Sequence, residues 1–210
     1  MTQTAELAPS DGFAYDYFGE ALSMDGDTAI VTTIQLCGDC QPPSAAYVFV
    51  KPATGWVNTT ETAKLTASDV QQGCPFGGSV SLSAGTAVAG AGDGTAYVFV
   101  EPNGGWVSMT ETAQLTGAGA DAVAISGNVI LVSKGQGLGG STVGHAFVFL
   151  KPPDGWRSTS RYNHELTVRF PLGGDNFGYD AALSGTTGVV GAYDAPSGAG
   201  PGEAILFSAQ

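Results

Sequence analysis

Positive charge, reactive side chains and long apolar runs are all scarce in this sequence. Lysine and arginine together number 7 against 19 acidic residues, and the formal net charge at pH 7 is −12. A surface this acidic repels nucleic-acid phosphates and anionic lipid headgroups, so we expect no nucleic-acid partner. No apolar run reaches the roughly 18 residues that a membrane span requires, so we also expect no membrane insertion.

The N-terminus lacks the features of a secretion signal. The segment "MTQTAELAPSDG" has neither the basic start nor the apolar centre of a signal peptide. Two interpretations remain open at this point: a cytoplasmic chain, or a secreted chain whose leader is not part of this sequence.

Residues that perform chemistry are also few. The two histidines, His145 and His164, lie apart in sequence, no serine context recurs, and no carboxylate pair has buried-looking surroundings. Nothing here resembles a nucleophilic triad or an acid–base pair of carboxylates. We therefore expect no enzymatic activity.

Glycine and short apolar runs are what the sequence has in abundance. Glycine accounts for 32 of 210 residues, and 43% of residues are hydrophobic while only 12% are charged. Short runs of Val, Ala, Leu and Phe between glycine-rich turns predict β-strands, and the apolar content is sufficient for a core.

One sequence unit occurs four times. The segments "AYVFVKPATGW", "AYVFVEPNGGW" and "AFVFLKPPDGW" begin at Ala46, Ala96 and Ala146, and a shorter "AILF" begins at Ala204. Each is preceded by a segment such as "FGGSVSLSAGTAVAG", in which apolar residues alternate with period two around a turn. Each unit therefore predicts a four-stranded antiparallel meander, and a repeat of about 50 residues with four strands is typical of a propeller blade.

The repeats predict a single all-β domain, a β-propeller of four four-stranded antiparallel blades. The expected blades cover about 18–66, 76–116, 119–167 and 177–207. The third copy departs from the pattern, because Gly119-Ala120 stands where the other copies have Phe-Gly. We expect a weaker contact between blades at that place.

The two ends of the chain match different strands of the unit. "TAEL" at 4–7 matches "TAKL" at 62–65, a fourth strand, whereas the sequence ends just after a third strand. We expect residues 4–7 to complete the last blade of the same chain, since a closed ring has no free strand edge. The alternative is insertion beside the last strand of a neighbouring subunit, which builds a head-to-tail assembly such as a filament.

The Phe-Gly pair, the aromatic triplet and the Gly-Trp turn together resemble FG-GAP repeats, the blades of integrin α-subunit propellers and of several bacterial and fungal surface proteins and lectins. The resemblance runs from about Thr4 to Phe207. It implies a non-enzymatic extracellular or cell-surface protein that serves protein interaction, adhesion or self-assembly, with any leader absent from this chain. Its partners would be proteins or copies of itself. A carbohydrate-binding lectin is the alternative, with glycans as ligands.

The calcium loop of integrin-type blades is compressed here. That loop has the form Asp-x-Asp-x-Asp-Gly-x-x-Asp, whereas "MDGDTA" supplies only Asp25 and Asp27. Calcium needs several converging oxygens, so we expect neither calcium nor another cofactor. Asp93, Asp175 and Asn176 are isolated and are interpreted as turn-capping residues.

The three cysteines are Cys37, Cys40 and Cys74. In a meander blade their two loops emerge on the same face, so a disulfide from Cys74 to either of the other two is expected, in an oxidising compartment. A zinc site lacks a fourth ligand, and a redox Cys-x-x-Cys pair lacks a helix to lower its thiol pKa.

Recurring aromatic residues have two interpretations. We expect Phe18, Phe76 and Phe177 to lie between blades. Trp56, Trp106 and Trp156 either pack against a neighbouring blade or offer a flat face to a sugar ring. Finally, Asn58 begins the N-glycosylation sequence Asn-Thr-Thr on an expected surface turn.

Overall fold

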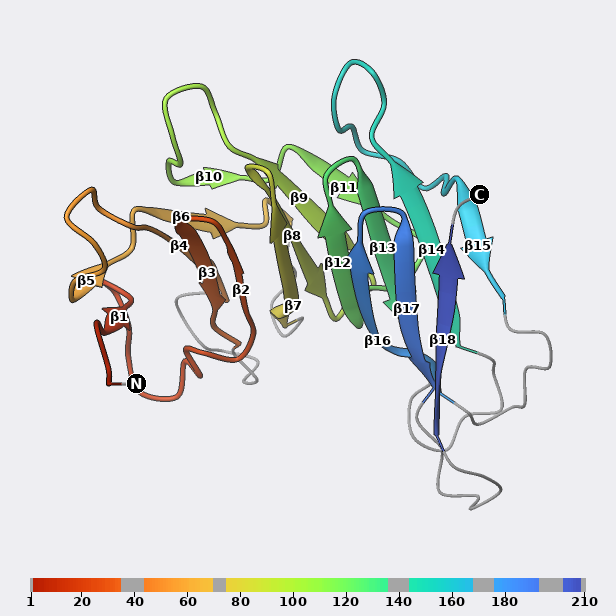
Figure 1. Ribbon diagram of the computed structural model, residues 1–210, viewed down its shortest axis with the longest axis horizontal. Coiled ribbons are helices and arrows are strands. Elements are labelled where there is room, and N and C mark those ends of the chain that lie inside the picture. Colours follow the sequence, from red (N-terminus) through yellow and green to blue (C-terminus); the bar gives the residue numbers. More distant parts are fainter. Residues whose placement is uncertain are drawn as a thin grey trace.

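The computed structural model describes residues 2–34, 44–69, 75–135, 144–167, 176–192 and 202–208. Over these residues the protein is all-β, with four main sheets that follow one another along an open arc (Figure 1). The prediction of an all-β chain of antiparallel sheets is therefore confirmed. Within the described segments, no helix is long and apolar enough to cross a membrane.

Each sheet corresponds to one repeat. The first sheet contains β2 (Leu22–Asp25), β3 (Thr28–Thr32), β4 (Ala46–Val50) and β6 (Ala63–Thr66). The second contains β7 (Phe76–Ser83), β8 (Thr86–Ala91), β9 (Ala96–Val100) and β11 (Ala113–Leu115). The third contains β12 (Ala122–Ser126), β13 (Val129–Lys134), β14 (His145–Leu150) and β15 (His164–Leu166), and the fourth contains β16 (Phe177–Ser184), β17 (Thr187–Ala192) and β18 (Glu203–Ser208).

Within each repeat, neighbouring strands are antiparallel and follow the order of the sequence. At the edge of the first sheet, β10 (Met109–Thr110) of the second repeat pairs in parallel with β6. The second sheet shows why the hairpins form: Ser83 pairs with Thr86, and the two residues between them, Ala84 and Gly85, have φ of 47° and 69°. Positive φ at both central residues twists the hairpin in the sense that the strands require. Residues that alternate along the sequence thus point to opposite faces of each sheet.

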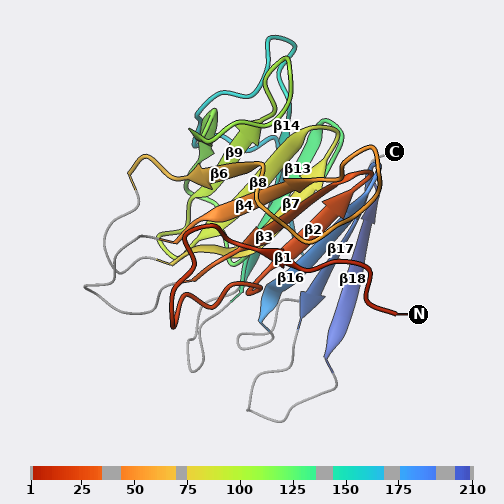
Figure 2. The same cartoon turned by 90° about the vertical axis from the view of Figure 1, so that its left-hand side faces the viewer.

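Apolar side chains fill the spaces between consecutive sheets, which we call junctions 1, 2 and 3 in chain order. Figure 2 shows the sheets lying one behind another, face to face. Val48 and Leu65 of the first sheet pack in junction 1 with Phe76, Tyr97 and Phe99 of the second, all fully buried. The core is therefore divided into layers between sheets, as in a solenoid or propeller.

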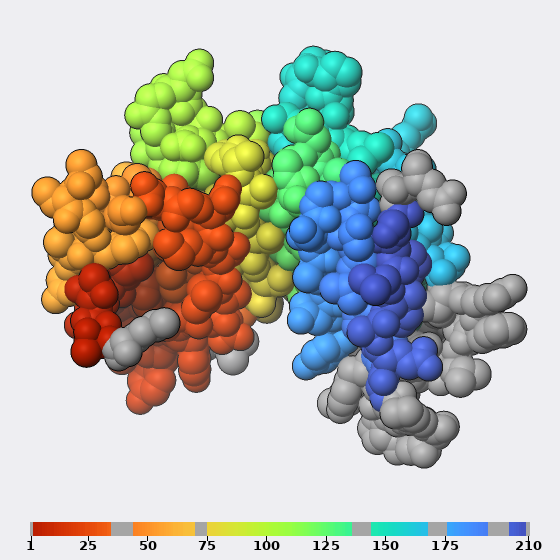
Figure 3. All heavy atoms as spheres, viewed as in Figure 1, coloured from red at the N-terminus to blue at the C-terminus, as the bar shows by residue number. Residues whose placement is uncertain are grey.

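The N-terminal segment does not complete the fourth sheet of its own chain, in contrast to the predicted closure. Strand β1 (Leu7–Ala8) pairs in parallel with β5 (Thr59–Thr60), next to the first sheet. Strand β18 has only β17 beside it among the described strands. The physical reason is the shape of the arc: β1 and β18 lie at opposite ends of the longest axis (Figure 1), and the second and third sheets separate the outer two (Figure 3).

Candidate functional site

Each junction combines an apolar layer with hydrogen bonds from serine. In junction 2 the hydroxyl oxygens of Ser79, Ser81 and Ser83 accept from the backbone N–H groups of Val123, Ile125 and Gly127, at 3.0, 3.1 and 3.1 Å. The N–H groups of an edge strand would otherwise be unpaired inside the molecule. The serines on β7 therefore bind the first strand of the following sheet.

The same bonds recur in the other junctions with fewer members. In junction 1, Ser23 accepts from the N–H of Leu82 at 3.0 Å, and the carboxylate of Asp25 accepts from Ala84 at 2.7 Å. In junction 3, Ser126 accepts from Gly185 at 2.9 Å. Asp25 thus has a structural role between sheets, and the pattern marks the face of each sheet that meets the next one.

The Phe-Gly pair forms a bulge at the start of a repeat. Phe76 pairs with Ala91, the register shifts before Ser79, and Gly77 between them has φ of 89°. A Cβ on Gly77 would lie 2.9 Å from the Cβ of Thr32 in the previous sheet. Glycine is required by both the positive φ and the close approach, and the bulge turns the phenyl ring into the junction.

The structure places Phe76 and Phe177 between consecutive sheets, whereas Phe18, for which the same position was predicted, lies on the outer side of the first sheet. Phe76 and Phe177 are 0% and 1% exposed, and Phe18 is half-buried at the outer face of the first sheet. Phe76 meets Tyr97 and Phe99 edge-on, with ring centroids 5.5 and 6.1 Å apart. This geometry suits the quadrupoles of aromatic rings.

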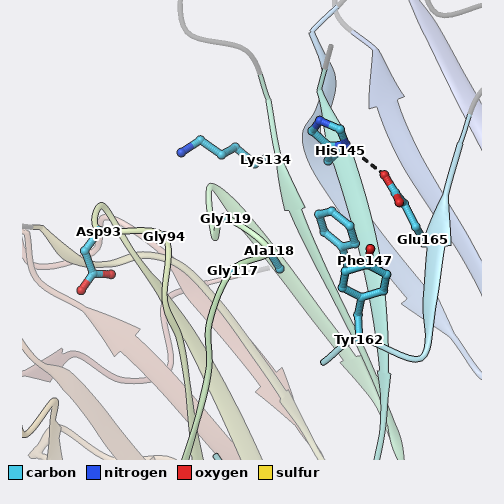
Figure 4. Close-up of a pocket in the computed structure, with 10 residues that line it drawn as sticks. All are labelled: Asp93, Gly94, Gly117, Ala118, Gly119, Lys134, His145, Phe147, Tyr162 and Glu165. Carbon is cyan, nitrogen blue, oxygen red and sulfur yellow. Dashed lines mark hydrogen bonds and ion pairs between the residues drawn. The ribbon is translucent and has the colours of Figure 1, made fainter. Parts of the chain in front are cut away.

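Junction 2 differs because its repeat has Gly119-Ala120 in place of Phe-Gly. A pocket of about 550 Å³ lies beside this position. Figure 4 shows its side chains: Phe147 and Tyr162 form one wall, and the His145–Glu165 pair lies above them. The pocket residues come from the second and third sheets and their loops: Asp93, Gly94, Gly117, Ala118, Gly119, Lys134, His145, Phe147, Tyr162 and Glu165.

The pocket has aromatic and charged groups in separate places. The rings of Phe147 and Tyr162 are 4.5 Å apart, and the imidazole of His145 stacks on Phe147 at 5.7 Å. His145 Nδ1 lies 3.1 Å from Glu165 Oε1. Lys134 lies on the opposite side (Figure 4). Such a surface suits a small polar ligand with one flat apolar side.

One carboxyl near this pocket is perturbed. Burial raises the pKa of Asp121, and the ammonium of Lys134 partly offsets the rise. No group of three or more His, Cys, Asp or Glu side chains that would hold a metal ion occurs among the residues that the structure describes.

Two of the three recurring tryptophans lie inside junctions. Trp106 packs in junction 1 and Trp156 in junction 2, at 4% and 7% exposure, so neither presents a face to a sugar. Trp56 is half-buried and packs with Leu7, Phe18 and the fully buried Phe49 on the outer side of the first sheet. Trp106 and Trp156 therefore pack between sheets, which is one of the two interpretations of the sequence, whereas Trp56 does not lie in a junction.

Junction 3 contains no tryptophan, and an apolar groove of about 380 Å³ lies there instead. Leu166 lines this groove. It holds the same strand position as Leu65 and Leu115, which pack in the clusters of Trp106 and Trp156 in junctions 1 and 2. Sequence reasoning missed this groove, although the fourth repeat of the sequence contains no Gly-Trp turn and offers the signal.

Other predicted residues lie apart from the pocket. Asn58 is exposed, and its side-chain oxygen accepts from the N–H of Glu6 at 2.8 Å. Asp27 pairs with Lys51 at 2.5 Å. Asp93 accepts from the N–H of Thr95 at 2.8 Å, as expected of a turn-capping residue.

The remaining candidates either lie outside the described residues or are separated. Cys37, Cys40, Cys74 and Asp175 lie outside the described residues, so the disulfide stays a prediction. Asn176 is buried with φ of 51°. His164 lines the groove of junction 3, whereas His145 lines the pocket of junction 2.

Two sheet faces at the ends of the arc carry exposed apolar residues. The N-terminal face, on the side of the first sheet away from junction 1, exposes Leu22 at 71% and Met24 at 57%. The C-terminal face, on the side of the fourth sheet away from junction 3, exposes Leu206 at 72%, together with Ala204. Both faces were missed from the sequence, because the same residue types are buried in the inner repeats.

Comparisons with known proteins agree with the repeat pattern. The family model described as FG-GAP repeat matches residues 1–49 and 59–99, so the predicted resemblance is confirmed over most of the N-terminal half. Among solved structures, the chain is similar to the crystal structure of the computationally designed Ika4 protein. The TM-score is 0.56 and the identity 16%, over 100% of both chains, a likeness of fold alone. No curated protein matches this chain.

Proposed function

Because most of the N-terminal half of this chain consists of FG-GAP repeats, we propose that the protein is a non-enzymatic interaction domain whose four sheets are propeller blades. It acts by associating with proteins through its open sheet faces. In accordance with the family resemblance, its place is outside the cell or on the cell surface. Adhesion and self-assembly are the two forms of such an activity.

The C-terminal face carries this proposal. Leu206 pairs with Val189 in the fourth sheet as Val48 pairs with Ile30 in the first and Val98 with Val88 in the second. Val48 and Val98 are fully buried against the next sheet, whereas Leu206 is 72% exposed. A face with the composition of a core layer and no cover is a typical protein-binding surface.

The association is tested by light scattering after size-exclusion chromatography, over a range of protein concentrations. We expect the chain to form species larger than a monomer, and Leu206→Asp to shift them to monomer because a charge would enter the contact. Val107→Asp is the control, since Val107 is 52% exposed and lies in the loop between β9 and β10, outside the strands of the fourth sheet. A chain that stays monomeric at all concentrations and binds no protein overturns the proposal.

The pocket in Figure 4 favours a second candidate function, carbohydrate binding. Tyr162 is 44% exposed beside Phe147, and an exposed aromatic ring next to charged hydrogen-bonding groups suits a pyranose. The pocket lies at the third repeat, where Gly119-Ala120 replaces the Phe-Gly pair.

This second candidate is tested on a glycan array, followed by calorimetric titration of any glycan bound. We expect Tyr162→Ala to abolish binding, with Tyr15→Ala as the control because Tyr15 is 81% exposed and outside the pocket. An array without signal, or binding that survives Tyr162→Ala, excludes this pocket as a sugar site.

A further inference from the structure

The N-terminal segment lies against the first sheet as a fourth strand lies against the following sheet. Leu7 pairs in parallel with Thr59, and Leu65, which ends the "TAKL" match, pairs in parallel with Met109. The N–H of Glu6 donates to Asn58 Oδ1 at 2.8 Å, and the N–H of Lys64 donates to Ser108 Oγ at 3.0 Å. The two sets of contacts are equivalent, with Glu6 and Leu7 each 58 positions before their counterparts Lys64 and Leu65.

The equivalence continues beyond the strand into the side-chain hydrogen bonds. The hydroxyl of Ser10 donates to Glu61 at 2.6 Å, as that of Ser68 donates to Glu111 at 2.5 Å. The hydroxyl of Tyr47 donates to Asp11 at 2.8 Å, as that of Tyr97 donates to Asp69 at 2.9 Å. Residues 5–11 therefore occupy the position of the last strand and exit loop of a preceding blade.

That preceding blade is incomplete within the described residues. Residues 63–65 also pair on their other side, antiparallel with β4, whereas residues 5–7 have no strand on that side among the described ones. The fourth sheet lacks the complementary part: β18 is a third strand without a fourth. One end of the arc thus offers a fourth strand, and the other end offers a place for it.

We infer that residues 4–7 form the fourth strand of the last sheet in a second copy of this chain. The partner is the second copy because the two ends of one arc are separated (Figure 1). The register follows from the first sheet, where Ala46 pairs with Leu65, Tyr47 with Lys64 and Val48 with Ala63. Transferred by repeat position, Ala204 meets Leu7, Ile205 meets Glu6 and Leu206 meets Ala5.

The side chains of the two end faces complement one another in this arrangement. Leu206 on the C-terminal face meets the exposed Leu22 and Met24 on the N-terminal face. These two residues hold the strand positions of Val80 and Leu82, which pack with Val48 in junction 1. The exposed hydroxyl of Ser184 corresponds to Ser83, which accepts from Gly127. In the proposed contact, the hydroxyl oxygen of Ser184 therefore faces the backbone N–H of Gly26 in the second copy. The contact recreates a junction in both its apolar and its polar part.

Such a contact is head-to-tail, so repeated addition closes a ring or builds a filament according to the rotation of each copy. This inference rests on the proposed function, because it names the partner of the same open faces. It differs in specifying which strand enters which sheet, and in what register.

Cysteine cross-linking tests the register in the full chain, with Cys37, Cys40 and Cys74 replaced by serine. One preparation carries Glu6→Cys and the other Ile205→Cys, and the two are mixed and oxidised mildly. Directly opposed residues on neighbouring strands place their Cβ atoms close enough for a disulfide. We expect a covalent dimer from this mixture, and none when Glu203→Cys replaces Ile205→Cys, because that position is two residues out of register.

The outcomes separate the inference from the proposed function. Association by light scattering without the covalent dimer leaves the proposed function standing and overturns the inference. No association overturns both. A chain carrying both cysteines that links only within itself, seen as a monomer of altered mobility with the cross-linked peptide in its digest, shows a ring closed by its own strand and also overturns the inference.

A second variant keeps the test independent of the cysteine replacements. The N–H of Thr62 donates to the carbonyl of Val48 at 2.7 Å in the first sheet, so the equivalent bond would run from Thr4 to Leu206 of the second copy. Thr4→Pro removes that donor. We expect the dissociation constant of the association to rise about tenfold, with the melting temperature of the dilute monomer unchanged. An unchanged dissociation constant contradicts the inference.

Discussion

The second and fourth sheets are built from the same repeat, yet one is covered on both faces and the other on one. Val98 and Leu206 hold the same place in their sheets, and their exposures are 0% and 72%. The difference in exposure comes from the neighbouring sheet, which covers Val98 and not Leu206, and not from the type of residue. Burial in a repeat protein is therefore decided by whether a neighbouring unit covers the face.

The second and third repeats teach the converse lesson. Their surroundings are alike, but Phe76 fills its junction while Gly119 leaves a pocket beside Phe147. A single ring in one repeat thus decides between a filled junction and a concave site.

The largest expected effect contrasts the covered and open faces. Val98→Asp places a charge in a fully buried layer without a partner, so we expect a loss of more than about 4 kcal/mol, enough to prevent folding. Leu206→Asp should change the free energy of unfolding of the monomer by less than about 0.5 kcal/mol. Urea unfolding at low protein concentration measures both, and comparable losses would contradict the open C-terminal face.

The next effect concerns the ring at the start of the repeat. Phe76→Ala should destabilise the protein by about 3–5 kcal/mol, because the fully buried ring fills junction 1 between two sheets. Phe18→Ala should cost less, since Phe18 is half-buried at the N-terminal face. Thermal and urea melts compare the two, and an unchanged melt for Phe76→Ala would exclude its place in the core.

The hydrogen bonds between sheets give a smaller difference. Ser81→Ala leaves the N–H of Ile125 without its acceptor, so we expect a loss of about 1–3 kcal/mol. Ser184→Ala, on the open face, should stay within about 0.5 kcal/mol in the dilute monomer. Equal effects at the two serines would show that the hydrogen bond in junction 2 makes no net contribution to the free energy of unfolding.

The smallest effect depends on pH. Burial raises the pKa of Glu111, but hydrogen bonds from Ser68 and Gln114 outweigh it and hold the pKa below the usual range. Because the folded pKa is lowered, the stabilisation is present above the ordinary pKa of about 4.5 and is lost as pH falls through the folded value. Melts between pH 3 and 7 should therefore show a shallower acid decline for Glu111→Gln, by less than about 1 kcal/mol. An identical decline would contradict the assignment.

Much of the fold was predictable because its causes are local. The alternation of Val80 and Leu82 with serines, together with the Ala-Gly turn, predicts the hairpin of β7 and β8. The recurrence of the aromatic triplet predicts β4, β9 and β14. The pocket was not predictable in position, because the missing ring of Gly119 matters only once His145, Phe147 and Tyr162 have been brought around it.

The sequence by itself determined the strands and the four-fold repetition, since side-chain alternation and turn chemistry act within a few residues. Only the tertiary structure decided that the arc stays open and that residues 5–11 take the place of a preceding blade. The reason is geometric: ring closure depends on the rotation summed over every junction, and no single repeat carries that sum in its own sequence.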